Sequence, residues 1–508
     1  LRRVGSDELN PFILALLPDA ALRVQVECLV YLFDCGGIEG ILEGAEYLKQ
    51  WVNHPEARQR SAAAYAMGEI GVRFFRKDYL SLFDDSDMNV KKACIRAARK
   101  AVPNTLLPLL VRQLASQELG ALSVEALSSL SAEQLIPACR LQLPFLRQHT
   151  TGLPHLIELV SRYTSSQALD LLMELFLEPQ FSVKYAVIQQ LSRLRYEHEL
   201  DTSAYHTLLQ SQLSQEVYFG FLYLQILYQV QGKRAHHPRY RFLHHEIERR
   251  YQERIEMLFL LLGLLYPSYE MEQARQNYTS GNPHFRALSL EVLNYTLESE
   301  WILSITTLLD DISPAQKIRR AHENHWSDPI PDGQWHVHPL MQQDLWLSRL
   351  SQWCLTYPKE SAMFPIIERM FVLQQSALFA QFGAEVLSTI AEVCHNIRYQ
   401  DGETIFKAND EASAFYFIAR GKVNLYTQSN QLLHTLNTFE GFGEIELLSE
   451  SKRLATAEAN GPCELLCLQH KDFLDLMENH ASFAQSLLRS LAQRLSIQME
   501  PTSSSTLN

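Results

Sequence analysis

Histidine and cysteine are the side chains whose spacing could hold a metal ion in this protein. Cys463 and Cys467 lie four residues apart, but no second cysteine pair exists to complete a tetrahedral zinc site. Their apolar neighbours instead predict a buried strand, in which both thiols act as small apolar side chains. Four histidines occur between Pro314 and Pro339, where prolines and a glycine favour a surface loop (His322, His325, His336 and His338). The sequence therefore favours no metal and no catalytic centre, with a histidine-bound metal as the weaker alternative.

A basic segment could bind acidic groups. Residues 233–254 contain seven Lys or Arg side chains and three acids, in a chain whose formal net charge is -13. Such a segment could face lipid headgroups or an acidic partner. Pairs such as Glu246 and Arg250, one helical turn apart, would instead give a solvated helix face with its own ion pairs. We favour the solvated face and keep the binding surface as the alternative.

Length and composition limit the classes of protein that this chain can belong to. Its 508 residues predict two or more domains, and 58 acidic against 45 basic residues argue against a nucleic-acid partner. Eight scattered cysteines predict a reducing compartment, so we expect a cytoplasmic protein, with the inner face of the membrane as the place that the basic segment suggests. No run reaches the roughly 20 apolar residues of a membrane span. Because the chain begins at Leu1 without a methionine, an upstream membrane domain stays open.

A repeated two-helix unit predicts the fold of the N-terminal part. In each copy a polar turn precedes a helix rich in alanine or other apolar residues, and the copies lie at 53–71, 84–98, 180–188 and 280–293. The polar residue can cap the helix, and small residues let neighbouring helices approach closely. A single helical hairpin cannot bury its apolar face, so the units must stack. The pattern resembles HEAT repeats and predicts an α-solenoid, with an irregular all-helical domain as the alternative.

Short alternating runs predict a small β-roll near the C-terminus. Turns such as Asp401-Gly402 and Arg420-Gly421 separate them, and evenly spaced short strands with glycine corners are typical of such a roll. The expected strands are 403–406, 414–418, 422–426, 432–436 and 463–468. We expect a helix over 376–394 before the roll, and helices over 472–477 and 484–498 after it. The fold class is therefore mainly α, a HEAT-like solenoid followed by a small β-roll with flanking helices.

Residues 399–406 and 415–423 resemble the opening of a cyclic nucleotide-binding domain, of the kind found in cAMP receptor proteins and protein kinase A regulatory subunits. Residues 442–448 and 453–456 resemble the phosphate-binding cassette of that family, in which an arginine follows a glutamate by nine residues. The resemblance implies that cAMP or cGMP is the ligand.

The resemblance also implies roles for the residues of the cassette. Arg453 would pair with the exocyclic phosphate oxygens, Glu444 would accept from the ribose 2'-hydroxyl, and Gly443 would let the backbone approach the ligand. Thr456 could add a hydroxyl near the phosphate or base, and the last helix, around Leu491–Leu495, would close over the base as an apolar lid. The predicted ligand-binding residues are Phe442, Gly443, Glu444, Ile445, Glu446, Arg453, Leu454, Ala455 and Thr456.

Three positions depart from the pattern of the family. Glu446 stands where a small residue is usual, and its charge would repel a phosphate unless the side chain points outward. Lys452 replaces the proline that often precedes the arginine, and Phe439 replaces a glycine before the cassette. Lys452 could offset Glu446, or Arg453 could be only a structural partner of the acids. Ligand binding and a vestigial domain that only contacts protein are therefore both open.

A looser resemblance joins the two parts of the chain. Residues 254–261, 264–267, 285–288 and 366–373 are similar to a bacterial group that attaches HEAT repeats and a cyclic nucleotide-binding domain to a transporter-like membrane domain, similar to ATP/ADP translocases or major-facilitator transporters. It implies a cytoplasmic regulatory module that senses a cyclic nucleotide and acts on a protein partner or a transmembrane transporter. One alternative is a scaffold whose solenoid binds protein while the β-roll only packs. Another is an enzyme such as a HEAT-type bilin lyase, although no nucleophile, base and orienting group stand out.

Five segments follow from these patterns. They are HEAT-like repeats at 1–200, an atypical helical segment with the basic stretch at 201–268, further HEAT-like repeats and linker helices at 269–372, a cyclic nucleotide-binding-like domain at 373–500, and a flexible tail at 501–508.

Overall fold

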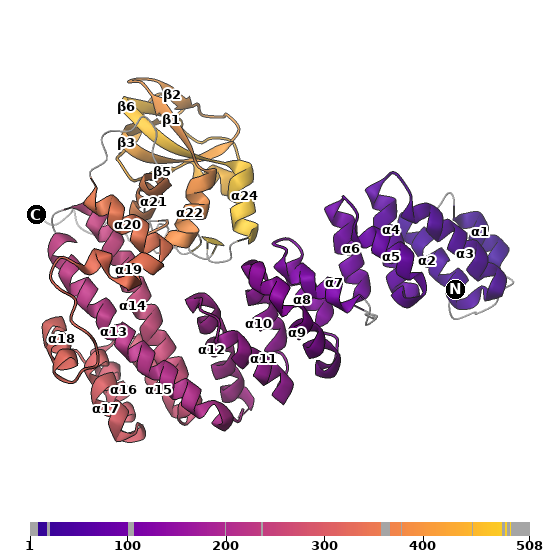
Figure 1. Ribbon diagram of the computed structural model, residues 1–508. Coiled ribbons are helices and arrows are strands. Elements are labelled where there is room, and N and C mark those ends of the chain that lie inside the picture. Colours follow the sequence, from indigo (N-terminus) through magenta and orange to yellow (C-terminus); the bar gives the residue numbers. More distant parts are fainter. Residues whose placement is uncertain are drawn as a thin grey trace, which may run out of the picture. The chain divides into compact units, whose positions relative to one another are not determined.

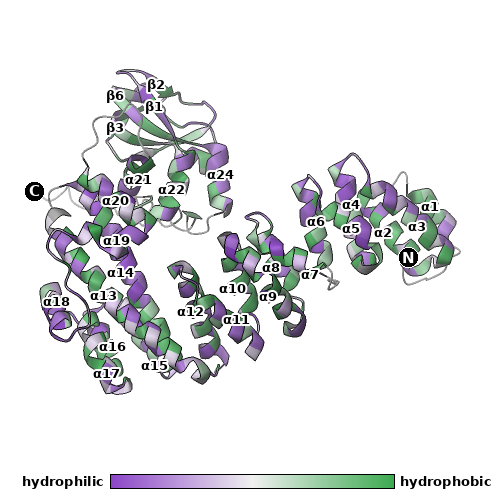
Figure 2. Ribbon diagram, in the orientation of Figure 1, coloured by the Kyte–Doolittle hydropathy of each residue, from purple (hydrophilic) through white to green (hydrophobic). Residues whose placement is uncertain are grey.

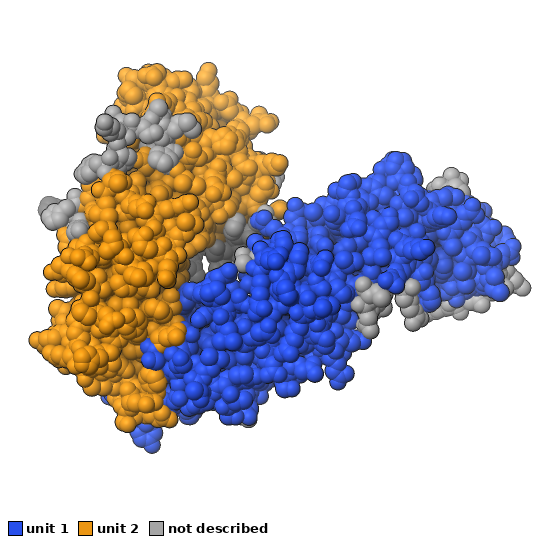
Figure 3. All heavy atoms as spheres, viewed as in Figure 1, with its two compact units in different colours: residues 1–214, 257–297 blue, residues 215–256, 298–508 orange. Residues whose placement is uncertain are grey.

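The computed structural model describes residues 9–17, 21–99, 106–198, 200–234, 237–356, 366–376, 378–380, 382–449, 451–479, 483–484 and 488 (Figure 1). The chain divides into two compact units, residues 1–214 with 257–297 and residues 215–256 with 298–508 (Figure 3). Two long helices, α13 (His206–Arg234) and α14 (Pro238–Leu265), contribute residues to both units. The expected lid at 491–495 and the expected tail at 501–508 lie outside the described residues.

The described part of the first unit is helical. Its helices carry both hydrophobic and hydrophilic residues (Figure 2), as expected for helices that bury one face. They are α1 (Asn10–Leu16), α2 (Leu22–Cys35), α3 (Gly37–Val52), α4 (Ala57–Ile70), α5 (Arg76–Phe83), α6 (Met88–Ala98), α7 (Leu107–Arg112), α8 (Gly120–Leu127), α9 (Ala132–Gln148), α10 (Leu153–Val160), α11 (Ser166–Phe176), α12 (Phe181–His198), α15 (Ser268–Thr279) and α16 (Pro283–Thr296).

Small residues allow α4 and α6 to pack closely. A Cβ atom placed on Gly68 would lie 2.7 Å from the Cα of Ala97, so no larger residue fits there without movement. Two of the expected caps are present, because the side chain of Asp87 accepts from the N–H of Asn89 and that of Asn282 accepts from the N–H of His284. The helix α4 begins without a side-chain cap.

An ion pair ties α4 to the turn before α6. The Nε of Arg60 donates to Asp85 at 2.6 Å, and Nη2 donates to its second carboxylate oxygen at 3.0 Å. The hydrogen bond from Arg60 holds the pKa of Asp85 below its usual value. The polar turn before α6 is therefore held against α4, the corresponding helix of the preceding repeat. Stacked repeats need such contacts between neighbouring units. The HEAT assignment and the five segment boundaries stay predictions.

The second unit contains the rest of the described helices. Part of the 314–339 segment is helical rather than a loop, because Ser313 and Gln316 form a capping box that starts α18. Within the described ranges, no group of three or more His, Cys, Asp or Glu side chains could hold a metal ion, and each helix is too short or too polar to span a membrane. The shorter helices are α17 (Ser299–Leu309), α18 (Pro314–Glu323), α19 (Pro339–Gln343), α20 (Leu345–Leu355), α21 (Ile366–Gln375), α22 (Ala384–Val393) and α24 (His470–Asn479).

A small antiparallel sheet follows α22, as the sequence predicts. Its strand order is β1-β6-β3-β4, while β2 pairs with β6 and β5 pairs with β3. Figure 1 shows α21, α22 and α24 beside this sheet. The strands are β1 (His395–Tyr399), β2 (Thr404–Phe406), β3 (Ala414–Tyr426), β4 (Leu432–Leu436), β5 (Gly441–Phe442) and β6 (Thr456–Gln469).

The predicted strands are found, but β6 begins at Thr456 rather than at 463, and β5 was not expected. The runs 414–418 and 422–426 form one strand, which bends at Gly421, where φ is 93° and a Cβ would lie 2.7 Å from the Cβ of Cys463. The strand β1 was not expected, and α22 begins only at Ala384, so a continuous helix over 376–394 is wrong. Cys463 and Cys467 are buried in β6, as predicted.

Candidate functional site

The cassette begins where β5 ends. Phe442 pairs with Tyr416 of β3, and their rings stack with centroids 5.4 Å apart. The next residue, Gly443, has a φ of 86°, and the one-turn helix α23 (Glu444–Leu448) follows it. A Cβ on Gly443 would lie 2.5 Å from Nη1 of Arg453. Glycine is therefore required here both by the backbone conformation and by the approach of the arginine.

Arg453 is buried inside the domain, with 1% of its surface exposed. Its Nη1 donates to the carbonyl oxygen of Gly443 at 2.9 Å, and its Nη2 donates to the carbonyl oxygen of Ala414. The guanidinium carbon lies 4.1 Å from the centroid of the Phe406 ring. The backbone N–H of Arg453 donates to the carbonyl oxygen of Asp410 at 2.9 Å, which fixes the position of the backbone from which the side chain extends. Strands β2, β3 and β5 and the turn before β3 thus position the guanidinium together.

Glu446 points toward this arginine. Its carboxylate lies 3.6 Å from Nη1 of Arg453, and its Oε1 accepts from the N–H of Leu454 at 3.3 Å. Only 9% of Glu446 is exposed, so the side chain does not reach out into solvent. The outward direction that a phosphate would require is therefore not the one found. The physical reason is that a buried guanidinium gains more from a nearby carboxylate than from carbonyl groups alone.

The charge of Arg453 is only partly compensated. Burial lowers the pKa of Arg453 from its ordinary value, and the carboxylate of Glu446 acts against that change. Among the described residues, the buried Nε of Arg453 has no hydrogen-bond partner. A further anion near this guanidinium would therefore find a donor that the protein leaves unused.

The other predicted ligand residues divide into two groups. Glu444 is buried, with 2% of its surface exposed, and Thr456 accepts from the N–H of Ala408 at 3.0 Å. Ile445 and Leu454 are instead 55% and 66% exposed, and Ala455 is half-buried. The structure thus gathers Gly443, Glu446, Arg453 and the backbone of Leu454, while the side chains of Ile445 and Leu454 face solvent.

Two groups that contact the guanidinium of Arg453 were not predicted from the sequence. Phe406 and the carbonyl of Ala414 contact Arg453, although each lies about 40 residues before it or more. Phe406 ends the predicted strand 403–406, so an aromatic ring at a strand end was the available signal. A backbone carbonyl carries no signal in the side-chain pattern.

The basic segment forms a network of ion pairs. Arg249 donates to Glu253 at 2.5 Å and to Glu385 of α22 at 2.6 Å, and it pairs with Glu246 at 3.3 Å. Arg250 donates to Asp344 at 2.7 Å and also to Glu385. The expected ion pairs within the helix are present, as between Arg249 and Glu253, but among the described residues Arg250 pairs with Asp344 and Glu385 rather than with Glu246. The face is therefore not only solvated, because both arginines also bind acids from outside their own helix.

The comparisons with known proteins concern this C-terminal part. Residues 396–480 match the family described as cyclic nucleotide-binding domain. The predicted domain is thus confirmed. The cyclic AMP receptor protein of Thermus thermophilus is 33% identical over 127 residues, which are 24% of this chain and 59% of that protein. A cAMP-dependent protein kinase regulatory subunit of Debaryomyces hansenii is 31% identical over 101 residues, which are 20% of this chain and 22% of that protein.

Solved structures give matches in the same region. The catabolite activator protein of Thermus thermophilus matches with a TM-score of 0.23 and 34% identity, over 24% of this chain and 60% of that one. The regulatory domain of Toxoplasma gondii PKA, solved with cAMP, matches with a TM-score of 0.23 and 20% identity, over 26% of this chain and 49% of that one. The chain covers less than two thirds of each of these relatives. The HEAT-repeat and transporter resemblances stay predictions.

Proposed function

We propose that the cyclic nucleotide-binding domain of this chain binds cAMP or cGMP, and that binding regulates a partner. The observation that carries this proposal is the buried guanidinium of Arg453, which lies beside Gly443 and keeps an unused donor at Nε. A cyclic phosphate is a compact anion, and a charged donor in a desolvated position binds such an anion strongly. The family match over residues 396–480 supports the same ligand.

In this proposal the phosphate takes the place of the Glu446 carboxylate. Glu446 already has one contact with the guanidinium and one with the N–H of Leu454, and both contacts suit a phosphate oxygen. Replacing one anion by another leaves the buried arginine paired throughout. Glu446 must turn away to make room, so we expect weaker binding than in a cassette with a small residue at this position.

Calorimetric titration of the full chain with cAMP and with cGMP tests the proposal. We expect heat that saturates with one of them, a loss of binding in Arg453→Ala, and unchanged binding in Arg420→Ala, whose arginine is on β3 outside the cassette. Because Arg453→Ala removes buried hydrogen bonds, its fold must be checked by circular dichroism. If neither nucleotide binds to the wild type or to Glu446→Gln, the proposal is wrong.

We further propose that the bound state is transmitted through α22 and α14. Glu385 of α22 binds both Arg249 and Arg250 of α14, so a movement of α22 would pull on two charged contacts at once. A coupling of about 1–3 kcal/mol is typical of such regulation. The HEAT-like helices would carry the change to a protein partner or to a transmembrane transporter domain, at the inner face of the membrane in the second case. We expect no enzymatic activity, no metal and no nucleic-acid partner.

The second candidate function is a protein scaffold whose domain binds no nucleotide. It is favoured by the hydrogen bonds of Arg453 to the carbonyl groups of Gly443 and Ala414, which give the arginine a structural role without any ligand. The titration separates the two functions, because a scaffold gives no heat with either nucleotide.

A further inference from the structure

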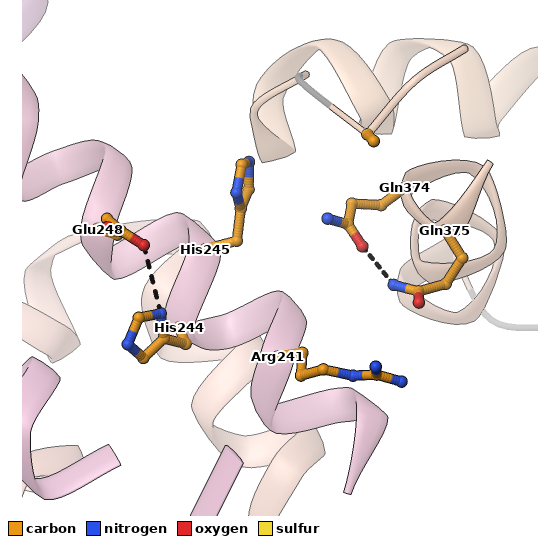
Figure 4. A pocket seen from close by; sticks show the side chains of 7 residues that line it. Arg241, His244, His245, Glu248, Gln374 and Gln375 are labelled. Atoms are coloured by element: carbon orange, nitrogen blue, oxygen red, sulfur yellow. Dashed lines mark hydrogen bonds and ion pairs between the residues drawn. The ribbon is translucent and has the colours of Figure 1, made fainter. Parts of the chain in front are cut away.

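A polar hollow lies outside the cassette, within the second unit (Figure 4). Its volume is about 320 Å³, and side chains of α14 face the end of α21 across it. The residues from α14 follow the spacing of one helix face, so a single stripe of the helix lines one wall. The lining consists of Arg241, His244, His245, Glu248, Gln374, Gln375 and Ala380.

The hollow is rich in unused hydrogen-bond donors. Arg241 is exposed, and no carboxylate of the described chain pairs with it. The Nε2 of His245 is buried and, among the described residues, has no hydrogen-bond partner. The amide oxygen of Gln374 accepts from Gln375 at 2.5 Å, which leaves the amide nitrogen of Gln374 facing the space toward His245 (Figure 4).

The acid in this lining is already engaged. Glu248 lies with its carboxylate 3.5 Å from Nδ1 of His244, which is on the same helix. Burial, and then the charge of Arg249, lower the pKa of His245, so this ring is neutral at neutral pH. A neutral imidazole can still donate one hydrogen bond from Nε2. Among the described residues, Arg241 is therefore the charged side chain of the lining that has no ion-pair partner, and the groups near it can donate hydrogen bonds.

We propose that this hollow binds a small organic oxyanion, a molecule that carries a phosphate or carboxylate group. Arg241 supplies the charge for the oxyanion, and His245 and Gln374 donate to its oxygens. An apolar ligand would leave the buried Nε2 of His245 unpaired, and a cation would be repelled by Arg241. This site is separate from the nucleotide cassette and does not depend on it.

The position of the hollow gives such an anion a structural effect. Phe371 of α21 contacts Phe242 of α14, with ring centroids 6.4 Å apart, and Phe439 before β5, at 5.8 Å. Arg239 and Glu368 add a 3.9 Å ion pair between the same two helices. An anion held by Arg241 and Gln374 would strengthen the contact between α14 and α21, and α21 in turn contacts the loop that leads into the cassette.

Titration of the full chain with glycerol 3-phosphate and with succinate, at constant ionic strength, tests this site. We expect saturable binding of at least one of them, and the two arms show whether a phosphate or a carboxylate is preferred. Arg241→Ala should weaken binding at least about tenfold, the loss typical of a charged hydrogen bond. His245→Phe should weaken it by a smaller factor, because one neutral donor is lost.

Two control variants test whether the anion binds in this hollow rather than elsewhere on the protein. Arg319→Ala removes an exposed arginine of α18 in the same unit and should leave binding unchanged. Arg420→Ala, which changes an exposed arginine of β3 outside the cassette, should also leave it unchanged. The proposal is overturned if neither anion binds with saturation, if Arg241→Ala binds as the wild type does, or if Arg319→Ala weakens binding as much as Arg241→Ala.

Discussion

The carboxylate of Glu446 lies 3.6 Å from the guanidinium of Arg453, in the position where the sequence pattern leads one to expect a small residue. It also accepts from the backbone N–H of Leu454. The protein therefore provides an anion of its own for the buried arginine. This internal pair does two things at once, since it stabilises the guanidinium and competes with any phosphate that approaches.

Glu446→Gln should tighten the binding of the cyclic nucleotide about tenfold. The amide keeps the size and hydrogen-bonding capacity of the side chain but removes a negative charge next to the phosphate, and such a repulsion is worth about 1–4 kcal/mol at 4 Å. Calorimetry gives the affinity of both proteins. Glu478→Gln, which changes an exposed acid on α24, should bind as the wild type does. Unchanged or weaker binding by Glu446→Gln would show that the two anions do not compete.

Gly443→Ala should destabilise the domain more than Gly461→Ala. Both glycines have positive φ angles, 86° and 81°, so each alanine carries a similar backbone cost of about 1 kcal/mol. At Gly443 the new Cβ would also lie 2.5 Å from Nη1 of Arg453, whereas nothing lies within 4 Å at Gly461. Chemical unfolding measures both costs, and equal losses of stability would contradict the close approach of Arg453.

Arg453→Lys should lower the free energy of unfolding of the domain by about 2 kcal/mol even without nucleotide. Lysine keeps the charge, but it cannot donate to the carbonyl groups of Gly443 and Ala414 at the same time as it covers the ring of Phe406. Denaturant unfolding monitored by fluorescence measures the change. A variant as stable as the wild type would mean that the arginine serves the ligand alone.

Asp85→Asn should destabilise the first unit at pH 7 and not at low pH. The hydrogen bond from Arg60 lowers the pKa of Asp85 in the folded protein, so this carboxylate stabilises the fold above its unfolded pKa. That contribution is lost as the pH falls below about 4 and the folded carboxylate takes up its proton. Thermal melting of both proteins between pH 7 and pH 3 should show the difference narrowing. A difference that stays constant with pH would rule out the charged pair as its cause.

Arg250→Ala should lower the stability of the second unit by about 2 kcal/mol and leave binding to anionic liposomes unchanged. Its guanidinium is held by Asp344 and Glu385, so its removal leaves the partly buried carboxylate of Asp344 without this partner, while Glu385 keeps its contact with Arg249. Thermal melting and liposome sedimentation are the two measurements. If the wild type binds liposomes and the variant does not, Arg250 faces the membrane and the prediction is wrong.

The β-roll was predictable because its signals are local. Alternation and glycine corners mark β4 within the bounds that the structure gives, and buried thiols mark β6. The strand β1 was missed because only Ile397 and Tyr399 of its five residues pack on the core. Two apolar residues make an alternating run that is too short to indicate a strand. Gly383 indicated that a helix could begin at Ala384. The apolar residues on both sides of this glycine led instead to the prediction of one continuous helix.

The direction of Glu446 could not be read from the sequence. Its neighbours fix a short helix, but the side chain is drawn inward by Arg453, which comes seven residues later and is itself held by the carbonyl of Ala414. The direction thus depends on three segments that only the folded sheet brings together. The same holds for the basic segment, whose arginines meet Asp344 and Glu385, acids about 90 residues or more away along the chain.

The pairing of β6 has a consequence for how the protein matures during synthesis. Within the described chain, β1 and β2 pair with β6 alone. His395 of β1 cannot pair until its partner Cys467, 72 residues later in the chain, has been synthesised. Early helices such as α4 and α6 can associate as soon as both have left the ribosome, because their contacts are close in sequence. The roll closes only once translation has passed Gln469. A premature stop a few codons earlier would therefore leave the helices assembled and the nucleotide-binding domain open.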